Sequence, residues 1–201
     1  MKILIVPTIR EIYKNQIEAS VDLKLIELFK KIFKNATIDI YNFTIKENYD
    51  LILLAGGNNS IINNNADKVR NEINNIVYKF ALKKKIKIIG ICHGAHFLSK
   101  KFGFIIKRKK NHVGNHKIII NLNKTKSHKT VNSYHNETIK FTKIKNVNIF
   151  AIAEDNTVEA FHIKNRKILG IIWHPERYKK IKNFDKKLIK EFYATNRIVC
   201  R

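Results

Sequence analysis

The chain has 201 residues and a formal net charge of +24 at pH 7, from 40 Lys and Arg against 16 Asp and Glu. This length predicts one domain, spanning residues 1–201, that is large enough to bury its own core. Two cysteines exclude a disulfide framework. No apolar run reaches the length of a signal peptide core or a membrane span, so we expect a cytoplasmic location.

The basic charge fits either nucleic acid or a small anionic ligand. The excess is mostly Lys and is spread along the chain together with abundant Asn and Ile, which is typical of a coding bias. No helix-turn-helix, zinc-finger or aromatic RNA-binding pattern accompanies it. We therefore expect no nucleic-acid or membrane partner, and a basic binding protein remains the non-enzymatic alternative.

The first half of the chain alternates between strand and helix patterns. Apolar runs at Ile3–Pro7 and Leu51–Leu54 predict buried strands, and the alternation at Ala36–Tyr41 predicts another. Apolar residues at helical spacing predict helices over Ile17–Phe33 and Ala66–Lys85. The predicted order up to this point is strand, helix, strand, strand, helix.

The second half is predicted to be mostly β, with strands that can pair locally. It closes with a predicted helix over Phe184–Phe192. The short β-like runs are Phe102–Arg108, Lys117–Leu122, Lys129–Tyr134, Val147–Ala153, Val158–Ile163 and Ile168–Trp173.

Between the halves lies the segment Gly-Ile-Cys-His-Gly at 90–94, which follows the apolar run Ile86–Ile89 and continues into a helical pattern. This order predicts a strand, a tight turn and a helix, with Cys92 at the turn as a nucleophile. Gly90 and Gly94 fit because larger side chains would collide in such a turn. The helix N-terminus favours a thiolate at this position. A buried thiol without a chemical role is the alternative interpretation.

Two further segments fit the same chemistry. The Gly pair in Ala-Gly-Gly, 55–57, ends a buried strand, where a backbone N–H can form half of an oxyanion hole, although an ordinary turn has the same pattern. In Trp-His-Pro-Glu, 173–176, Pro175 favours an extended His174, so that Glu176 can orient the imidazole. On its own, such a His-Pro-Glu segment is commonly a surface turn.

The combination of these segments resembles the class I glutamine amidotransferase superfamily. The resemblance covers nearly the whole chain, and it implies a single glutamine amidotransferase domain over residues 1–201. It also implies an α/β, flavodoxin-like fold, with a mostly parallel central sheet flanked by helices and added antiparallel strands. The matching segments are Leu-Leu-Ala-Gly-Gly (53–57), Gly-Ile-Cys-His-Gly (90–94), Val-Asn-Ser-Tyr-His (131–135), Val-Glu-Ala (158–160) and Trp-His-Pro-Glu (173–176).

The resemblance implies a catalytic triad of Cys92, His174 and Glu176. The backbone N–H groups of Gly57 and His93 would form the oxyanion hole. This chemistry needs no metal and no organic cofactor. The spacing of His and Cys in the sequence does not indicate a structural zinc site.

Within the superfamily, the chain is more similar to the free-standing γ-glutamyl hydrolases than to synthetase-coupled glutaminases. Coupled members usually carry Gln at the positions that His96 and Ile172 occupy here. We therefore expect a small γ-glutamyl amide or phosphoramidate as substrate. The more specific expectation is a nucleotide diphosphate conjugate, cytidine diphosphate–glutamine, used in capsular polysaccharide modification. Candidate substrate contacts are His96, Asn115, Tyr134 and His135.

Three functions remain open at this point. An autonomous γ-glutamyl hydrolase predicts activity from the single chain, whereas a glutaminase subunit that delivers ammonia to a separate synthetase predicts weak activity until the partner is added. A basic binding protein on a degenerate fold is the third. The histidines His112, His116, His128 and His135 lie close together in the sequence, and we interpret them first as loop and strand residues. The sequence does not predict an oligomeric state.

Overall fold

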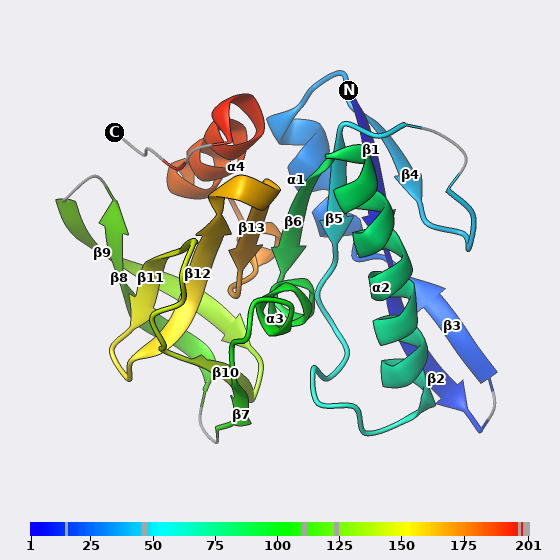
Figure 1. Cartoon of the computed structure of the whole chain (residues 1–201), viewed down its shortest axis with the longest axis horizontal. Helices are drawn as coiled ribbons and strands as arrows, with labels where there is room; N and C mark the ends of the chain where they lie inside the picture. Colours follow the sequence, from blue (N-terminus) through cyan, green and yellow to red (C-terminus); the bar gives the residue numbers. More distant parts are fainter. Residues whose placement is uncertain (15, 46–47, 110–111, 123–124, 197, 199–201) are drawn as a thin grey trace.

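The structure is a computed structural model, and its centre is a large mixed sheet (Figure 1). The strand order is β4-β1-β5-β6-β13-β12-β11-β8-β9. The described residues are 1–14, 16–45, 48–109, 112–122, 125–196 and 198. Five neighbouring strands run parallel: β4 (Thr37–Ile40), β1 (Lys2–Val6), β5 (Leu51–Leu54), β6 (Lys87–Ile91) and β13 (Ile168–Ile171).

The remaining strands of this sheet pair antiparallel and extend it on one side (Figure 1). The short strand β10 pairs with both β12 and β7. The fold class predicted from the sequence is thus confirmed, including the added antiparallel strands. These strands are β12 (Thr157–Ile163), β11 (Val147–Ala153), β8 (Val113–Leu122), β9 (Thr125–Tyr134), β10 (Glu137–Lys140) and β7 (Ile106–Arg108).

Helices cover both faces of the parallel strands. Ile3 and Ile5 of β1 pack in the cluster that contains the first and last helices, whereas Leu4 and Val6 pack in the cluster of the two middle helices. Because the inner parallel strands β1, β5, β6 and β13 are buried on both faces, their sequences are largely apolar, whereas the edge strand β4 is partly exposed and carries Asp39. The helices are α1 (Leu23–Ile32) and α4 (Asn183–Thr195) on one face, and α2 (Asn65–Lys84) and α3 (His93–Lys100) on the other.

The predicted helix over Ile17–Phe33 is wrong in its first part. Helix α1 begins only at Leu23, where the Asp22 side chain accepts a hydrogen bond of 3.0 Å from the backbone N–H of Lys24. Ile17, which suggested a longer apolar stripe, is 40% exposed. The segment before the helix forms a separate antiparallel hairpin of β2 (Thr8–Tyr13) and β3 (Gln16–Ser20).

The other predicted helices and strands are confirmed, with ends that differ by several residues. The prediction Phe102–Arg108 shrinks to β7, and β10 was not predicted. Short 3₁₀ turns lie at Lys164–Arg166 (η1) and Pro175–Arg177 (η2). Cys92 is a buried free thiol, and Cys200 lies outside the described residues. No helix in the described ranges is both long and apolar enough to cross a membrane.

Candidate active site

The turn between β6 and α3 carries Cys92. Its backbone has φ +49° and ψ −105°, a strained conformation for a residue with a side chain. Its N–H donates a hydrogen bond of 2.8 Å to the Ile171 carbonyl, which fixes the turn to β13. A Cβ on Gly90 would collide with the backbone of Gly94, and a Cβ on Gly94 would collide with the Leu54 carbonyl. The predicted sharp strand-to-helix turn is therefore present.

His174 lies next to this thiol because β13 is the parallel neighbour of β6, so that both strands end at the same edge of the sheet. Its Nδ1 lies 2.6 Å from Glu176 Oε1, and both residues are buried. Burial opposes the charge on the imidazole, but the Cys92 sulfur and the Glu176 carboxylate outweigh it and raise the pKa of His174 to about 9. The site therefore favours a protonated His174 imidazole next to the Cys92 sulfur.

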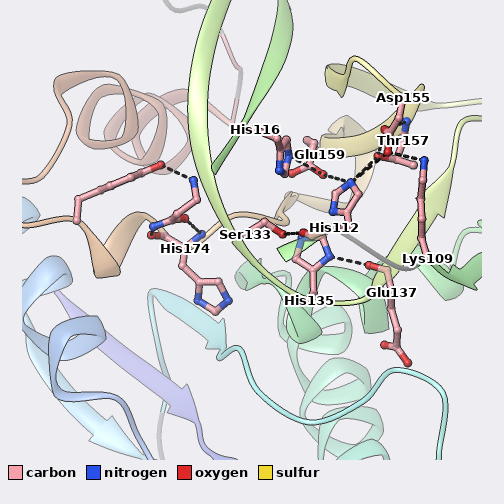
Figure 2. A network of polar contacts seen from close by, with 12 residues as sticks. Lys109, His112, His116, Ser133, His135, Glu137, Asp155, Thr157, Glu159 and His174 are labelled. Carbon is pink, nitrogen blue, oxygen red and sulfur yellow. Dashed lines mark hydrogen bonds and ion pairs between the residues drawn. The ribbon is translucent and has the colours of Figure 1, made fainter. Parts of the chain in front are cut away.

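Asn132 on β9 fixes the backbone of His174. Its Oδ1 accepts a hydrogen bond of 2.9 Å from the His174 N–H, and its Nδ2 donates one of 2.9 Å to the His174 carbonyl. Figure 2 shows His174 to one side of the group formed by His112, His116 and His135. Sequence reasoning missed this role, because a polar residue inside a strand gives no signal of what it contacts.

The glycine pair after β5 lies against the same side chains. A Cβ on Gly56 would lie 2.8 Å from His174 Cε1 and 3.5 Å from Cys92 Cβ, so only glycine leaves the imidazole its place. The Gly56 carbonyl accepts a hydrogen bond of 2.6 Å from Thr8 Oγ1. Since C=O and N–H point in opposite directions in a trans peptide, the Gly57 N–H points away from Thr8. Gly57 itself has φ +81° and lines the same cavity as Cys92.

The second predicted oxyanion donor is the backbone N–H of His93. His93 is the first residue of α3, and the N–H groups of a first helical turn have no acceptor within the helix. The dipole of the helix points its positive end toward the same place. The two backbone groups proposed from the sequence thus come from separate turns that both adjoin Cys92.

A cavity of about 390 Å³ opens over Cys92. Three of the predicted substrate contacts, His96, Tyr134 and His135, line it. The fourth, Asn115, is exposed and lines a separate hollow on β8. The residues around the cavity are Gly57, Asn58, Asn59, Cys92, His96, Arg108, Tyr134, His135, Asn136, Glu137, His174 and Arg177.

Two arginines that sequence reasoning missed bring positive charge to this cavity. The Arg177 guanidinium lies 4.7 Å from the centroid of the Tyr134 ring, and its Nε lies 3.4 Å from Asp22 Oδ2. Arg108 donates a hydrogen bond of 2.5 Å to Asn63 Oδ1. A guanidinium presents several donors in a fixed plane, which suits phosphate and carboxylate groups. Because the chain contains so many basic residues, its sequence does not distinguish these two arginines from the others.

The chain matches known proteins over most of its length. Residues 10–195 match the family model described as glutamine amidotransferase class-I. A γ-glutamyl-CDP-amidate hydrolase from Campylobacter jejuni is 33% identical over 176 residues, which cover 84% of this chain and 84% of that protein.

Two solved structures have a similar fold. A protein from Thermoplasma acidophilum, provisionally named as part of a GMP synthase, superimposes with a TM-score of 0.71 at 20% identity, covering 96% of this chain and 92% of that one. A glutamine amidotransferase from Thermotoga maritima gives a TM-score of 0.64 at 18% identity, covering 87% of this chain and 76% of that one. At such low identity these two structures show the fold alone, whereas the family match and the hydrolase relative show descent. The chain belongs to the class I glutamine amidotransferase family.

Proposed function

We propose that this chain is a cysteine hydrolase that cleaves a γ-glutamyl amide or phosphoramidate bond and releases L-glutamate. The observation that supports this most strongly is the buried arrangement of Cys92, His174 and Glu176, with an Nδ1 to Oε1 distance of 2.6 Å. The substrate that we propose is γ-glutamyl-CDP-amidate, which would give cytidine diphosphoramidate and glutamate in capsular polysaccharide modification. The support for this substrate is the 33% identity to a hydrolase of that name.

In the first step, the Cys92 thiolate attacks the γ-carbonyl carbon of the glutamyl group. The carbonyl oxygen becomes an oxyanion, which the N–H groups of Gly57 and His93 stabilise. Such a donor contributes about 3 kcal/mol in comparable sites because it is already aimed where charge develops. The hydrogen bond of 2.6 Å from Thr8 to the Gly56 carbonyl keeps one of the two peptides in this orientation.

His174 then transfers its proton to the departing nitrogen, and the C–N bond breaks to leave a γ-glutamyl thioester on Cys92. A pKa of about 9 keeps the imidazole protonated at neutral pH until this step. The neutral imidazole next accepts a proton from water, whose oxygen attacks the thioester and releases glutamate. Glu176 holds the ring by Nδ1 throughout, which keeps Nε2 for the proton transfers.

The leaving group determines which γ-glutamyl compound is cleaved. A nucleoside diphosphoramidate carries negative charge next to the scissile bond, and Arg108 and Arg177 lie on the lining of the cavity where such a group would extend. Glutamine has only ammonia to lose, so it would bring no anion to Arg108, and Arg177 would face only the carboxylates of Asp22 and Glu176. The charge of the cavity therefore favours the phosphoramidate over glutamine.

The test is glutamate release by the purified chain without any partner. kcat/KM is compared for γ-glutamyl-CDP-amidate, glutamine and a γ-glutamyl alkylamine, with Cys92→Ala as the inactive control. We expect a strong preference for the nucleotide conjugate and no turnover by Cys92→Ala. Equal or absent turnover of all three compounds would contradict the proposed substrate, and activity on glutamine that appears only with a synthetase would favour the glutaminase alternative.

A further inference from the structure

A second cluster of reactive side chains lies in the antiparallel half, between the active-site cavity and the hollow on β8. His112 directly precedes β8, His116 lies within it, His135 follows β9, and Glu159 is on β12. His112 and His135 each offer a ring nitrogen and Glu159 offers a carboxylate oxygen, and these three potential metal-ligand atoms lie within 4.8 Å of one another. Figure 2 shows the four side chains facing one another, and His116 Nε2 is 3.4 Å from Glu159 Oε1.

Three of the four side chains are buried, whereas the His116 side chain is 23% exposed. Glu159 is 1% exposed, His112 7% and His135 8%. His135 Nδ1 lies 2.7 Å from the Glu137 carbonyl, which accepts a hydrogen bond only if this nitrogen carries the proton. His135 Nε2 therefore carries a free lone pair and has no hydrogen-bond partner, as is also true of His112 Nδ1 and Glu159 Oε2, whereas Glu159 Oε1 lies 3.4 Å from His116 Nε2. Buried polar atoms without partners are costly, so this arrangement is incomplete without a further atom.

We propose that His112, His135 and Glu159, with His116 as a fourth ligand, form a binding site for Zn²⁺. Imidazole nitrogens with a carboxylate oxygen are a ligand set that zinc prefers in four-coordinate sites. Ligand atoms in a tetrahedral zinc centre lie roughly 3.3 Å apart, given bond lengths of about 2.0 Å. The separations of up to 4.8 Å among His112, His135 and Glu159 close with movements of roughly 1 Å or less for each side chain, and His116 Nε2 already lies 3.4 Å from Glu159 Oε1. The hydrogen bond from His135 Nδ1 to the Glu137 carbonyl would orient the imidazole so that Nε2 faces the metal ion.

Such an ion would join three segments that no disulfide or helix ties together: the start of β8, the turn after β9, and β12. His135 and its neighbour Tyr134 line the active-site cavity, so the ion would hold one wall of it in place. With four protein ligands the site has no open position for water, which makes its role structural. The sequence spacing did not indicate it, because the ligands come from separate strands rather than from one short motif.

The test measures zinc binding in a background that lacks thiol ligands. The full chain, purified without a polyhistidine tag, carries Cys92→Ala and Cys200→Ala, and Zn²⁺ affinity is measured by competition with a chromophoric chelator. We expect one Zn²⁺ per chain. Glu159→Gln should weaken binding by on the order of 100-fold or more, since loss of a mere outer-shell contact already costs about 10–100-fold. His128→Asn is the matched control, because His128 is an exposed histidine on β9, and its affinity should not change.

The melting temperature supplies a second measurement. Zinc at about 100 times its Kd should raise the melting temperature of the parent chain by roughly 5–10 °C, and that of Glu159→Gln by much less. If Glu159→Gln does not fold, His116→Gln replaces it, since this side chain is 23% exposed. No stoichiometric zinc in the parent chain, or equal affinity in the ligand variants and His128→Asn, would overturn the proposal. Because Cys92 is absent from every protein compared, the result does not depend on the proposed hydrolase activity.

Discussion

Replacing Gly56 by alanine should disable the proposed chemistry while the fold remains intact. The new Cβ would lie 2.8 Å from His174 Cε1, whereas ordinary contacts between carbon atoms are about 3.5–4.0 Å. Its distance of 3.5 Å to Cys92 Cβ is already an ordinary contact, so the imidazole has to move. The ring is displaced by roughly 1 Å, and an error of this size in a reacting group costs on the order of 100-fold in rate, or about 2.7 kcal/mol of barrier.

Two assays separate this effect from a loss of folding. The first is kcat for glutamate release from γ-glutamyl-CDP-amidate, which should fall by on the order of 100-fold with little change in KM. The second is the rate of Cys92 alkylation by iodoacetamide, which needs no substrate and should change as the thiol loses its imidazole partner. Circular dichroism and the melting temperature confirm that the variant is folded.

Gly103→Ala is the matched control. Gly103 has a positive φ, +85°, which Gly56 does not have, and nothing lies within 4 Å of an added Cβ. Its replacement should cost stability through backbone strain alone, about 1 kcal/mol, and leave kcat unchanged. If folded Gly56→Ala keeps kcat and thiol reactivity within about threefold of the parent chain, the placement of His174 does not limit the rate and the reasoning fails.

Further variants test the contacts that surround this pair. Asn132→Ala removes two buried hydrogen bonds to the His174 backbone and should lower the free energy of unfolding by about 2–4 kcal/mol, measured by urea titration. It should also lower kcat by at least about tenfold, because His174 loses its fixed position. An unchanged kcat would exclude a positioning role for Asn132. Thr8→Val removes the donor to the Gly56 carbonyl and should lower kcat by roughly tenfold at constant KM, because the neighbouring N–H loses its orientation; a change in KM alone would contradict this. Burial raises the pKa of Asp185 to about 6, so its stabilising effect is complete below about pH 4 and is lost as the pH rises through 6. Asp185→Asn keeps an acceptor for the buried Trp173 indole N–H but has no carboxyl group to titrate. Between pH 4 and pH 8 the parent chain should therefore lose about 2 kcal/mol of unfolding free energy that the variant does not lose, as measured by urea titration. Parallel pH profiles of the two proteins would refute the raised pKa.

The parts of the fold and site that were predictable are those that a few adjacent residues determine. The turn around Cys92 needs glycines at fixed offsets, and the apolar strands before it are buried on both faces, so each has a local pattern. His174 and Glu176 are two residues apart, so one short segment is enough to suggest their contact. These segments are sufficient to indicate the family from the amino-acid sequence.

The parts that were missed depend on contacts between distant segments. Thr8 reaches Gly56 across strands, and Asn132 reaches His174 from β9, so neither residue type signals its role in the sequence. Glu159 belongs to a segment that matches the family, but its histidine neighbours come from other strands. The hairpin before α1 resembles a helix in sequence because its alternating residues happen to continue the apolar spacing of the helix that follows.

The pairing of β6 with β13 also sets the order in which the reactive groups come together during folding. The two strands are neighbours in the sheet, yet the whole run from β7 to β12 separates them along the chain. Pairings across long stretches of chain are slow, because their loop entropy is lost before any contact compensates it. We therefore expect the strand that carries Cys92 to pair with β5 before β13 brings His174, so that a refolding chain should recover its backbone signal earlier than its thiol reactivity.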